Sequence, residues 1–252
     1  MSNPSRRKLI TTGLAATAGA TGLAAAAKIA DQYGLIAPDH GGVYGPGETL
    51  SYAAHRLLGS NSLAREFPRS LISNPPFANG RPPREEAYKK HQAEGFGNWR
   101  LVVDGMVARP ASFSIPELRS FPNRSQITHL ACEEGWSYIA EWTGVPLSQV
   151  LERVGLLPQA KFVVYFSIQP RWWNSFDMAE AMHPQTLVSY EMNGGELPIG
   201  HGGPLRMRVP RQLGYKSAKF INRVTVTDSL AGFGKGLGSS SAEGGYAWYA
   251  GI

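Results

Sequence analysis

The sequence predicts an α+β fold with mixed sheets and short helices. Short segments in which apolar and polar residues alternate, as in strands, are interleaved with short segments of helical periodicity. The 29 Gly and 18 Pro among 252 residues favour strands and loops over long helices. The sequence contains no internal repeat, sustained heptad, P-loop or dinucleotide-binding fingerprint, which argues against solenoids, coiled coils and nucleotide-binding folds.

The composition is that of a folded globular protein. Hydrophobic residues make up 42% of the chain, aromatic residues 10% and charged residues 17%, whereas a disordered chain has fewer aromatics and more charge. The formal net charge is +6, and half of it lies on Arg6, Arg7 and Lys8. The charge left on the rest of the chain is too small to indicate nucleic-acid binding.

Residues 1–27 are predicted to be a twin-arginine signal peptide. Arg6 and Arg7 follow a serine, residues 9–27 carry no charge, and the segment ends in small alanines. A transmembrane anchor of this length is conceivable, but so much Ala and Gly gains little from burial in hydrocarbon. We therefore expect export to the periplasm. Because a single cysteine cannot form an intrachain disulfide, export indicates a protein that carries a cofactor.

Residues 28–97 are predicted to form an irregular N-terminal arm that covers the core. Paired prolines at 75–76 and 82–83 and the Gly-Pro-Gly run at 45–47 interrupt any long element. Short helices are expected over 52–58 and 83–91.

Residues 98–230 are predicted to be the folded core. It begins with a strand that is predicted by the alternation over 99–103, followed by a turn at Asp104-Gly105 and a second strand over 106–109. Ser114 and Glu117 have the spacing of a capping box, which begins a short helix. Further strands are expected over 127–132, 162–168, 186–192, 205–209 and 221–227, and helices over 146–154 and 177–182. Residues 231–252 are predicted to be a loose Gly/Ser-rich tail that ends in aromatic residues.

The single cysteine, Cys132, allows three interpretations. It could be a small buried hydrophobe, although Gly135 and Trp136 beside it are more typical of a pocket rim. A nucleophilic thiol needs a lowered pKa, whereas Glu133 and Glu134 would raise it, and His129 faces the other side of a strand. Zinc would need further ligands at a recognisable spacing. A metal whose other ligands arrive on an organic cofactor resolves the conflict.

A second candidate site lies in residues 201–219. The Gly-Gly-Pro run after His201 permits close backbone approach, Arg206 and Lys219 supply positive charge, and Ser217 supplies a hydroxyl. Together these residues would suit a phosphate or pyrophosphate. The alternative is a solvated basic loop.

At these residues the chain resembles the molybdopterin-binding domain of the sulfite-oxidase superfamily. The resemblance is to its exported branch, which includes the periplasmic methionine-sulfoxide reductase catalytic subunits, and it runs from about Trp99 to Asp228. The motifs that carry it occur in order over 101–105, 132–137, 142–147, 181–187 and 201–219. The resemblance implies a sulfite-oxidase-type α+β domain with a molybdenum–molybdopterin cofactor.

The resemblance also implies roles near the metal. Cys132 stands where the family's cysteine gives its sulfur to molybdenum, the other two sulfurs coming from the pterin dithiolene. Glu134 stands where the family has a glutamate beside the metal, and we expect it to assist catalysis. Ser167 lies where the exported reductases have a threonine that contacts the cofactor.

Other residues correspond to the family's pterin and phosphate contacts. His201 and Arg206 occupy the positions that hold the pterin and its phosphate. Ser217, Ala218 and Lys219 match the loop that completes the phosphate pocket. The reductases carry Asn where His201 stands, which leaves the cofactor unchanged and makes the substrate less certain.

The expected reaction is oxygen-atom transfer, in the direction of reducing a neutral S-oxide or N-oxide on a small molecule or a protein. Glu133 and Glu134 beside the metal cysteine oppose an anionic substrate such as sulfite. The alternatives are a sulfite-oxidase-like dehydrogenase, a metal-free binding domain of the same fold, and a thiol hydrolase using Cys132 and His129. The sequence carries no haem or iron–sulfur motif, so we expect a haem-containing redox partner, such as a membrane cytochrome b. We also expect the protein to be a monomer.

Overall fold

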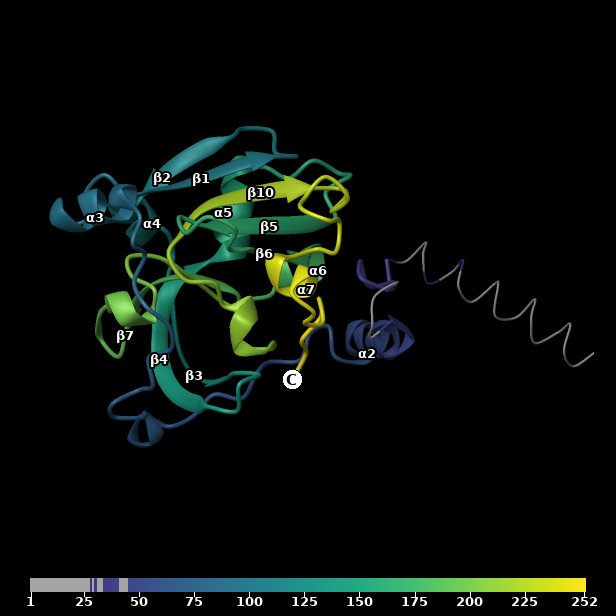
Figure 1. The fold of residues 1–252 in the computed structure, drawn as a ribbon, viewed down its shortest axis with the longest axis horizontal. Helices are drawn as coiled ribbons and strands as arrows, with labels where there is room; N and C mark the ends of the chain where they lie inside the picture. Colours follow the sequence, from purple (N-terminus) through teal and green to yellow (C-terminus); the bar gives the residue numbers. More distant parts are fainter. Residues whose placement is uncertain (1–27, 29, 31–33, 41–44) are drawn as a thin grey trace, which may run out of the picture.

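The computed structural model describes residues 28, 30, 34–40 and 45–252 and contains two sheets that enclose the main core (Figure 1). The segment predicted as a twin-arginine signal lies outside the described residues. Within those residues, no helix is both long enough and apolar enough to span a bilayer.

The first sheet has the strand order β2-β1-β10-β5-β6. Its strands are β1 (Arg100–Gly105), β2 (Ala111–Ser114), β5 (Phe162–Ser167), β6 (Trp173–Asp177) and β10 (Ile221–Thr227). β1 and β10 run parallel, with Val103 opposite Val224, and the other neighbours are antiparallel. The side chains of Leu101, Val103, Val224 and Val226 are buried on one face, as the alternation in the sequence predicts.

The second sheet is built on the long strand β4. It contains β3 (Arg124–Ala131), β4 (Ser137–Pro146), β7 (Leu187–Met192), β8 (Gly195–Glu196) and β9 (Arg206–Arg208). The pairing of β4 with β7 shifts register between Thr143 and Gly144. A Cβ at Gly144 would lie 2.3 Å from the carbonyl oxygen of Val188, so only glycine permits this approach.

Short helices close the edges of the core. They are α4 (Ile115–Arg119), α5 (Leu147–Val154), α6 (Met178–Ala181) and α7 (Ser240–Glu243), with 3₁₀ turns η1 (Arg69–Leu71), η2 (Ile199–His201) and η3 (Gly214–Lys216). The Ser114–Glu117 capping box forms as predicted. The predicted apolar face of α5 is wholly buried, including Leu147, Val150 and Leu151.

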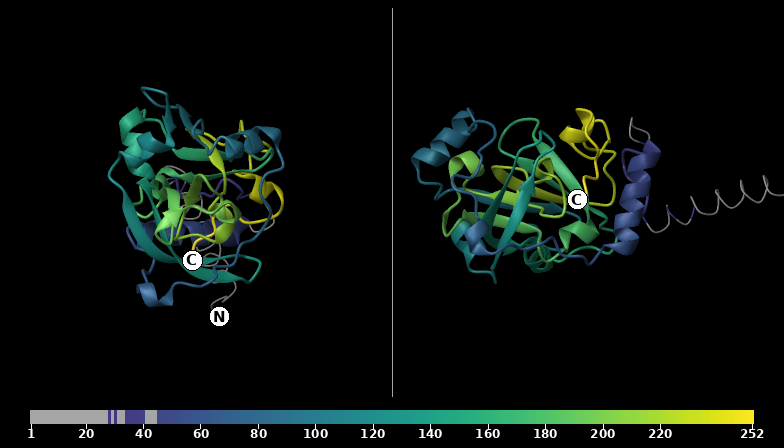
Figure 2. Two further views of the ribbon diagram at one scale, coloured as in Figure 1. Left: turned by 90° about the vertical axis from the view of Figure 1, so that its left-hand side faces the viewer. Right: turned by 90° about the horizontal axis from the view of Figure 1, so that it is seen from below.

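The arm contains α2 (Gly45–Leu58) and α3 (Glu86–Ala93), which lie at opposite ends of the molecule (Figures 1 and 2). Both helices were expected, although α2 begins seven residues earlier than the predicted range 52–58. Between them the chain follows the second sheet, where Phe67 N donates to Ile127 O and Ser73 N donates to Ile139 O. These contacts bring the arm alongside β3 and β4.

Two predictions about the fold are wrong. The second strand forms after Pro110, over β2, and not over 106–109, because Gly105 adopts a left-handed φ of 86° and Val107 forms only an isolated bridge to Leu156. The C-terminal segment is not loose. Trp248 is only 1% exposed, and its ring and that of Tyr249 pack against Tyr52 of α2.

Candidate functional site

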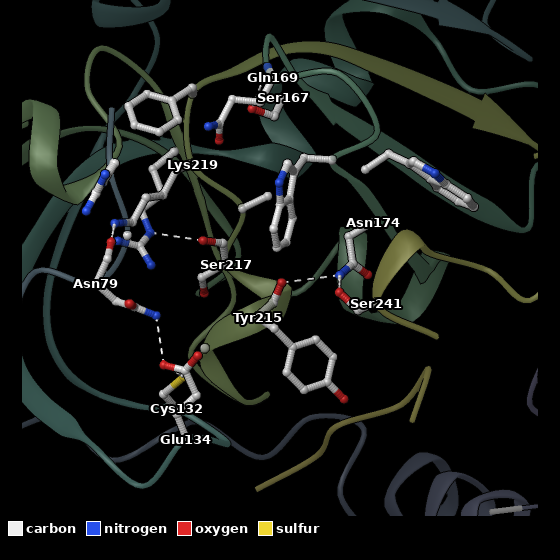
Figure 3. Close-up of a pocket in the computed structure, with 18 of the residues that line it drawn as sticks. Asn79, Cys132, Glu134, Ser167, Gln169, Asn174, Tyr215, Ser217, Lys219 and Ser241 are labelled. Carbon is white, nitrogen blue, oxygen red and sulfur yellow. Dashed lines mark hydrogen bonds between the residues drawn. The ribbon is translucent and has the colours of Figure 1, made fainter. Parts of the chain in front are cut away.

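A cavity of about 580 Å³ brings together five separate stretches of the chain (Figure 3). They are the turn after β3, the β5–β6 connection, the segment from β9 to β10, the C-terminal segment with Ser241 and Tyr246, and residues 79–85 of the arm, which we call the strap. Seven of the eight predicted site residues line it, namely Cys132, Glu134, Ser167, Arg206, Ser217, Ala218 and Lys219.

Cys132 directly follows β3 and is held by a tight turn. Its backbone N–H donates to Trp136 O at 2.9 Å, and Gly135, with a φ of 90°, donates to the carbonyl of Cys132. The thiol lies 3.1 Å from Glu133 Oε2. Burial, together with the Glu133 carboxylate, raises the pKa of Cys132 to about 11. The thiol therefore stays protonated at neutral pH unless a metal ion replaces the proton.

His129 does not assist this thiol. Its ring packs against Phe67 of the arm, with 6.3 Å between ring centroids, and the cavity is lined by other residues. The geometry gives no thiol–imidazole pair, so the hydrolase alternative lacks its base.

Glu134 links the cysteine turn to the strap. Its Oε2 accepts hydrogen bonds from Trp136 Nε1 at 2.7 Å and Asn79 Nδ2 at 2.9 Å (Figure 3). The same oxygen lies 4.0 Å from the sulfur of Cys132. Two donors fix a carboxylate next to the thiol, so a proton acceptor lies beside the place where a metal would bind.

Arg206 and Lys219 form the cationic end of the cavity. Arg206 is buried and donates from Nε to Ser217 O at 3.0 Å and from a guanidinium nitrogen to His201 O at 2.9 Å. Lys219 Nζ donates to the carbonyls of Asn79 and Gly200. Burial and the nearby Arg206 charge lower the pKa of Lys219 to about 7. Among the described residues, neither cation forms an ion pair with a carboxylate, so the pair is suited to an anionic ligand.

Of the remaining predicted site residues, Ser217 and Ser167 line the cavity and His201 does not. Ser217 Oγ accepts from Val209 N at 3.1 Å, and Ser167 Oγ accepts from Gln169 N at 3.1 Å. His201 does not line the cavity, because its ring lies against Tyr138 while its carbonyl holds Arg206. Burial lowers the pKa of His201 to about 4. Its direct contact with a cofactor stays a prediction.

The sequence analysis missed the strap. Arg81 and Arg84 line the cavity and add positive charge to it, and Asn79 contacts both Glu134 and Lys219. The strap lies in a Pro-rich stretch without periodicity. The only available signal was two arginines close together in the sequence.

The residues present fit the cofactor that the resemblance implies. Within the described part of the chain, no group of three or more His, Cys, Asp or Glu side chains is arranged to hold a metal ion. Cys132 offers one sulfur, the cavity has room for an organic group, and Arg206 and Lys219 suit a phosphate. Gly214, which lines the cavity, packs closely against the end of β3, since a Cβ there would lie 3.1 Å from the Leu130 side chain.

Comparisons with known proteins agree with this reading. The family model described as "Oxidoreductase molybdopterin binding domain" matches residues 88–231. A putative protein-methionine-sulfoxide reductase subunit YedZ1 of Azospira oryzae is 35% identical over 195 residues, which are 77% of this chain and 70% of that protein. The catalytic subunit MsrP of protein-methionine-sulfoxide reductase from Xanthomonas axonopodis is 35% identical over 147 residues.

The matched lengths differ among these proteins. The MsrP alignment covers 52% of this chain and 46% of that protein, so the chain spans about half the length of this relative. Among solved structures, the sulfane dehydrogenase SoxCD of Paracoccus pantotrophus matches with a TM-score of 0.51 and 25% identity. That match covers 53% of this chain and 39% of the other.

Proposed function

Because the chain belongs to the oxidoreductase molybdopterin-binding domain family, we propose that it reduces an S-oxide or an N-oxide by oxygen-atom transfer. The reaction takes two electrons and two protons, and it breaks the S–O or N–O bond and releases water. The electrons come from a donor outside this chain. A molybdenum–molybdopterin group, when bound, supplies the oxygen-transfer chemistry, and the protein positions and tunes it.

One observation carries this proposal: a single thiol and two cations, the buried Arg206 and the half-buried Lys219, face the same cavity. We assign Cys132 as the protein ligand to molybdenum. Arg206 and Lys219 bind the phosphate of the pterin, with Ser217 and Ala218 completing that wall. Ser167 contacts the cofactor from the β5 side, and Glu134 accepts or gives a proton beside the metal.

The substrate direction is supported by the carboxylates and by the relatives. Glu133 and Glu134 lie beside the thiol and repel an anion that approaches the metal. YedZ1 and MsrP are both named for reduction of methionine sulfoxide in proteins. Half-exposed aromatic rings at the cavity, such as Trp172 and Tyr246, suit an apolar group next to a neutral S–O bond.

The cellular setting is also a proposal. Arg6 and Arg7 with the uncharged stretch behind them support twin-arginine export to the periplasm. A haem-containing partner, such as a membrane cytochrome b, would deliver the electrons, because the sequence carries no haem or iron–sulfur motif of its own.

A second candidate is oxidation of an anionic sulfur compound. Arg81 and Arg84 line the cavity and could attract such an anion. The structural match to SoxCD, a sulfane dehydrogenase, points the same way. Such an oxidation takes its oxygen from water, releases two protons and passes two electrons to an acceptor outside this chain.

The test measures the cofactor content of the protein and its turnover. Purified full-length protein is analysed for molybdenum and pterin and then assayed with a reduced dye against sulfoxides and N-oxides, and with an oxidised dye against sulfite. We expect about one molybdenum per chain and dye oxidation that depends on the S-oxide or N-oxide. Brisk sulfite oxidation without oxide reduction would favour the second candidate. Protein without molybdenum, made in cells that synthesise molybdopterin, would contradict both.

A further inference from the structure

A buried polar cluster lies next to the loop that forms the phosphate end of the cavity. At its centre is Lys216, which is fully buried. Its ammonium group donates to Asn174 Oδ1 at 2.6 Å, to Ser175 O at 2.5 Å and to Trp248 O at 2.8 Å. Three acceptors satisfy the three donors of an ammonium group.

Lys216 is fixed at both of its ends. Its backbone carbonyl accepts a hydrogen bond from Tyr165 Oη at 2.7 Å. Its neighbours along the chain, Tyr215 and Ser217, line the cavity, whereas its own side chain points into the cluster. Asn174 also lines the cavity and donates to Tyr215 O at 3.2 Å. A shift of Lys216 would therefore move two walls of the cavity.

Two acids from the arm hold the C-terminal segment against this cluster. Asp39 Oδ2 accepts from Trp248 N at 2.9 Å, and Glu48 Oε1 accepts from Tyr249 N at 2.6 Å. Trp248 thus joins the two parts of the cluster, because its N–H binds Asp39 and its carbonyl binds Lys216.

Among the described residues, the second oxygens of these acids are not paired with another group. Asp39 Oδ1 and Glu48 Oε2 are both buried and have no hydrogen-bond partner. Burial and the neighbouring Asp39 raise the pKa of Glu48 to about 8. At neutral pH Glu48 is therefore protonated, and the negative charge of Asp39 acts on Lys216.

The other charged or titratable groups that face the pair belong to neighbouring elements. Tyr215 and Tyr249 adjoin it, and burial raises the pKa of both phenols, so they stay neutral. Asp177 and Glu180 act on Lys216 from β6 and α6, and Arg56 of α2 forms ion pairs with both. Two groups of the cluster therefore change charge between pH 6 and pH 9. They are Glu48 and Lys216, because burial lowers the pKa of Lys216 to about 7.

We propose that Lys216 is a positioning residue for the cofactor, and that the Asp39–Glu48 pair holds it in place by fastening residues 246–252 against the cavity loop. This inference rests on the proposed function in one respect, namely that the cavity holds a molybdopterin. Residues 246–252 then belong to the cofactor-binding machinery, although of these residues only Tyr246 lines the cavity.

The arrangement makes cofactor retention depend on pH. Glu48 has a higher pKa in the folded protein than in the unfolded chain, so the folded state binds the extra proton between about pH 4.5 and 8. The contribution of the pair to stability is complete below that range and is lost as the pH rises through 8. Two buried carboxylates then repel each other, and the fastening weakens.

The experiment compares the holoenzyme with two variants and a control. Lys216→Met removes the ammonium group and keeps the length of the side chain. Glu48→Gln retains an acceptor for Tyr249 N and a donor toward Asp39, so it imitates the protonated acid at every pH. Lys90→Met, at an exposed lysine on α3, is the matched control. Pterin per chain is measured after purification, and its release is followed during dialysis at pH 6 and pH 9.

We expect Lys216→Met to contain roughly tenfold less pterin than Lys90→Met, and wild-type protein to release pterin roughly tenfold faster at pH 9 than at pH 6. Glu48→Gln should show a smaller acceleration at pH 9 than wild type, because Lys216 and Lys219 still lose their protons but no second buried carboxylate forms. Full pterin in Lys216→Met, or equal acceleration at pH 9 in Glu48→Gln, would overturn the proposal. If Lys216→Met does not fold, Glu48→Gln decides alone.

A second readout separates this proposal from the proposed function. Wild-type protein without any pterin would contradict the proposed function, yet the cluster can still be tested by the thermal midpoint of the cofactor-free chain. From pH 6 to pH 9 the thermal midpoint of wild type should fall relative to that of Glu48→Gln. Parallel midpoints across this range would show that Glu48 does not change charge in the folded chain, which would overturn the pH dependence.

Discussion

Lys216 and Lys219 lie three residues apart on one loop, and both lose water when the chain folds, but their surroundings differ. Burial lowers the pKa of both lysines to about 7. Lys216, however, has three hydrogen-bond acceptors and lies near four carboxyl groups. Lys219 has two backbone carbonyls and the like charge of Arg206. The first charge is balanced within the protein. The second, among the described residues, is balanced by no carboxylate.

The difference distinguishes a lysine that binds a ligand from a lysine that holds the loop in place. A protein that leaves two cations side by side at a cavity loses stability unless an anion joins them. A lysine surrounded by acceptors needs no ligand and can hold the backbone in one place. We therefore read Lys219 as a residue that meets the cofactor and Lys216 as one that fixes the loop. The predictions below test this distinction.

The largest effect is expected at Cys132, the residue that would bind the metal. Cys132→Ala should lower turnover at least about 1,000-fold, because the protein's ligand to the metal is lost. The fold should survive, since the side chain is only half-buried and small. Turnover is measured with a reduced dye, and metal–sulfur ligation by X-ray absorption. An unchanged absorption spectrum in the variant would remove Cys132 from the metal site.

Arg206→Ala should leave the protein with about tenfold less pterin, because one of the two cations that meet the phosphate is removed. Fluorescence of the oxidised pterin extracted from a known amount of chain measures the occupancy. Arg223→Ala is the control, since Arg223 pairs with Asp104 on the outer face of the first sheet. Equal occupancy in both variants would mean that the cavity cations bind no phosphate.

An inorganic anion should distinguish the balanced lysine from the unbalanced one. Pyrophosphate at ten times its dissociation constant should stabilise the cofactor-free protein by about 1.4 kcal/mol at pH 6, or about 3–5 °C. The effect should shrink as the pH rises through 7, because Lys219 loses its proton there. Lys219→Met should abolish this pH dependence. A stabilisation that stays constant from pH 6 to pH 9 in wild type would contradict the assignment.

The smallest effect is expected at a polar contact with no link to the cavity. Ser114→Ala removes the cap of α4 and should cost about 0.5–1 kcal/mol of unfolding free energy, or about 1–3 °C. Pterin content should not change. A loss of pterin in this variant would show that occupancy follows overall stability, and the two lysines could then not be distinguished by it.

Sequence patterns predicted the elements whose signals are local. The Ser114–Glu117 box, the apolar face of α5 and the alternation in β10 each depend on residues within a few positions of one another. Strand β4 was missed because Gly144 lies inside it, and glycine in a sequence usually indicates a turn. The structure uses Gly144 for the close contact of β4 with Val188, which is a long-range feature.

The candidate site shows the same limit. Cys132, Arg206 and Lys219 stand in ordered motifs and could be found from sequence, and the structure brings all three to one cavity. The strap could not be found, because Asn79 reaches the cavity only through its contacts with Glu134 and Lys219, 55 and 140 residues away in sequence. Such contacts depend on the tertiary fold and leave no periodic signal.

The contacts of Asp39 and Glu48 with Trp248 and Tyr249 determine when the cavity can form during synthesis of the chain. Residues near position 40 and residues near position 248 fasten the same cavity loop. A nascent chain therefore cannot present a finished pocket until Trp248 has left the ribosome, and a chain terminated before that residue never can. Loading with cofactor would then single out molecules that include this segment.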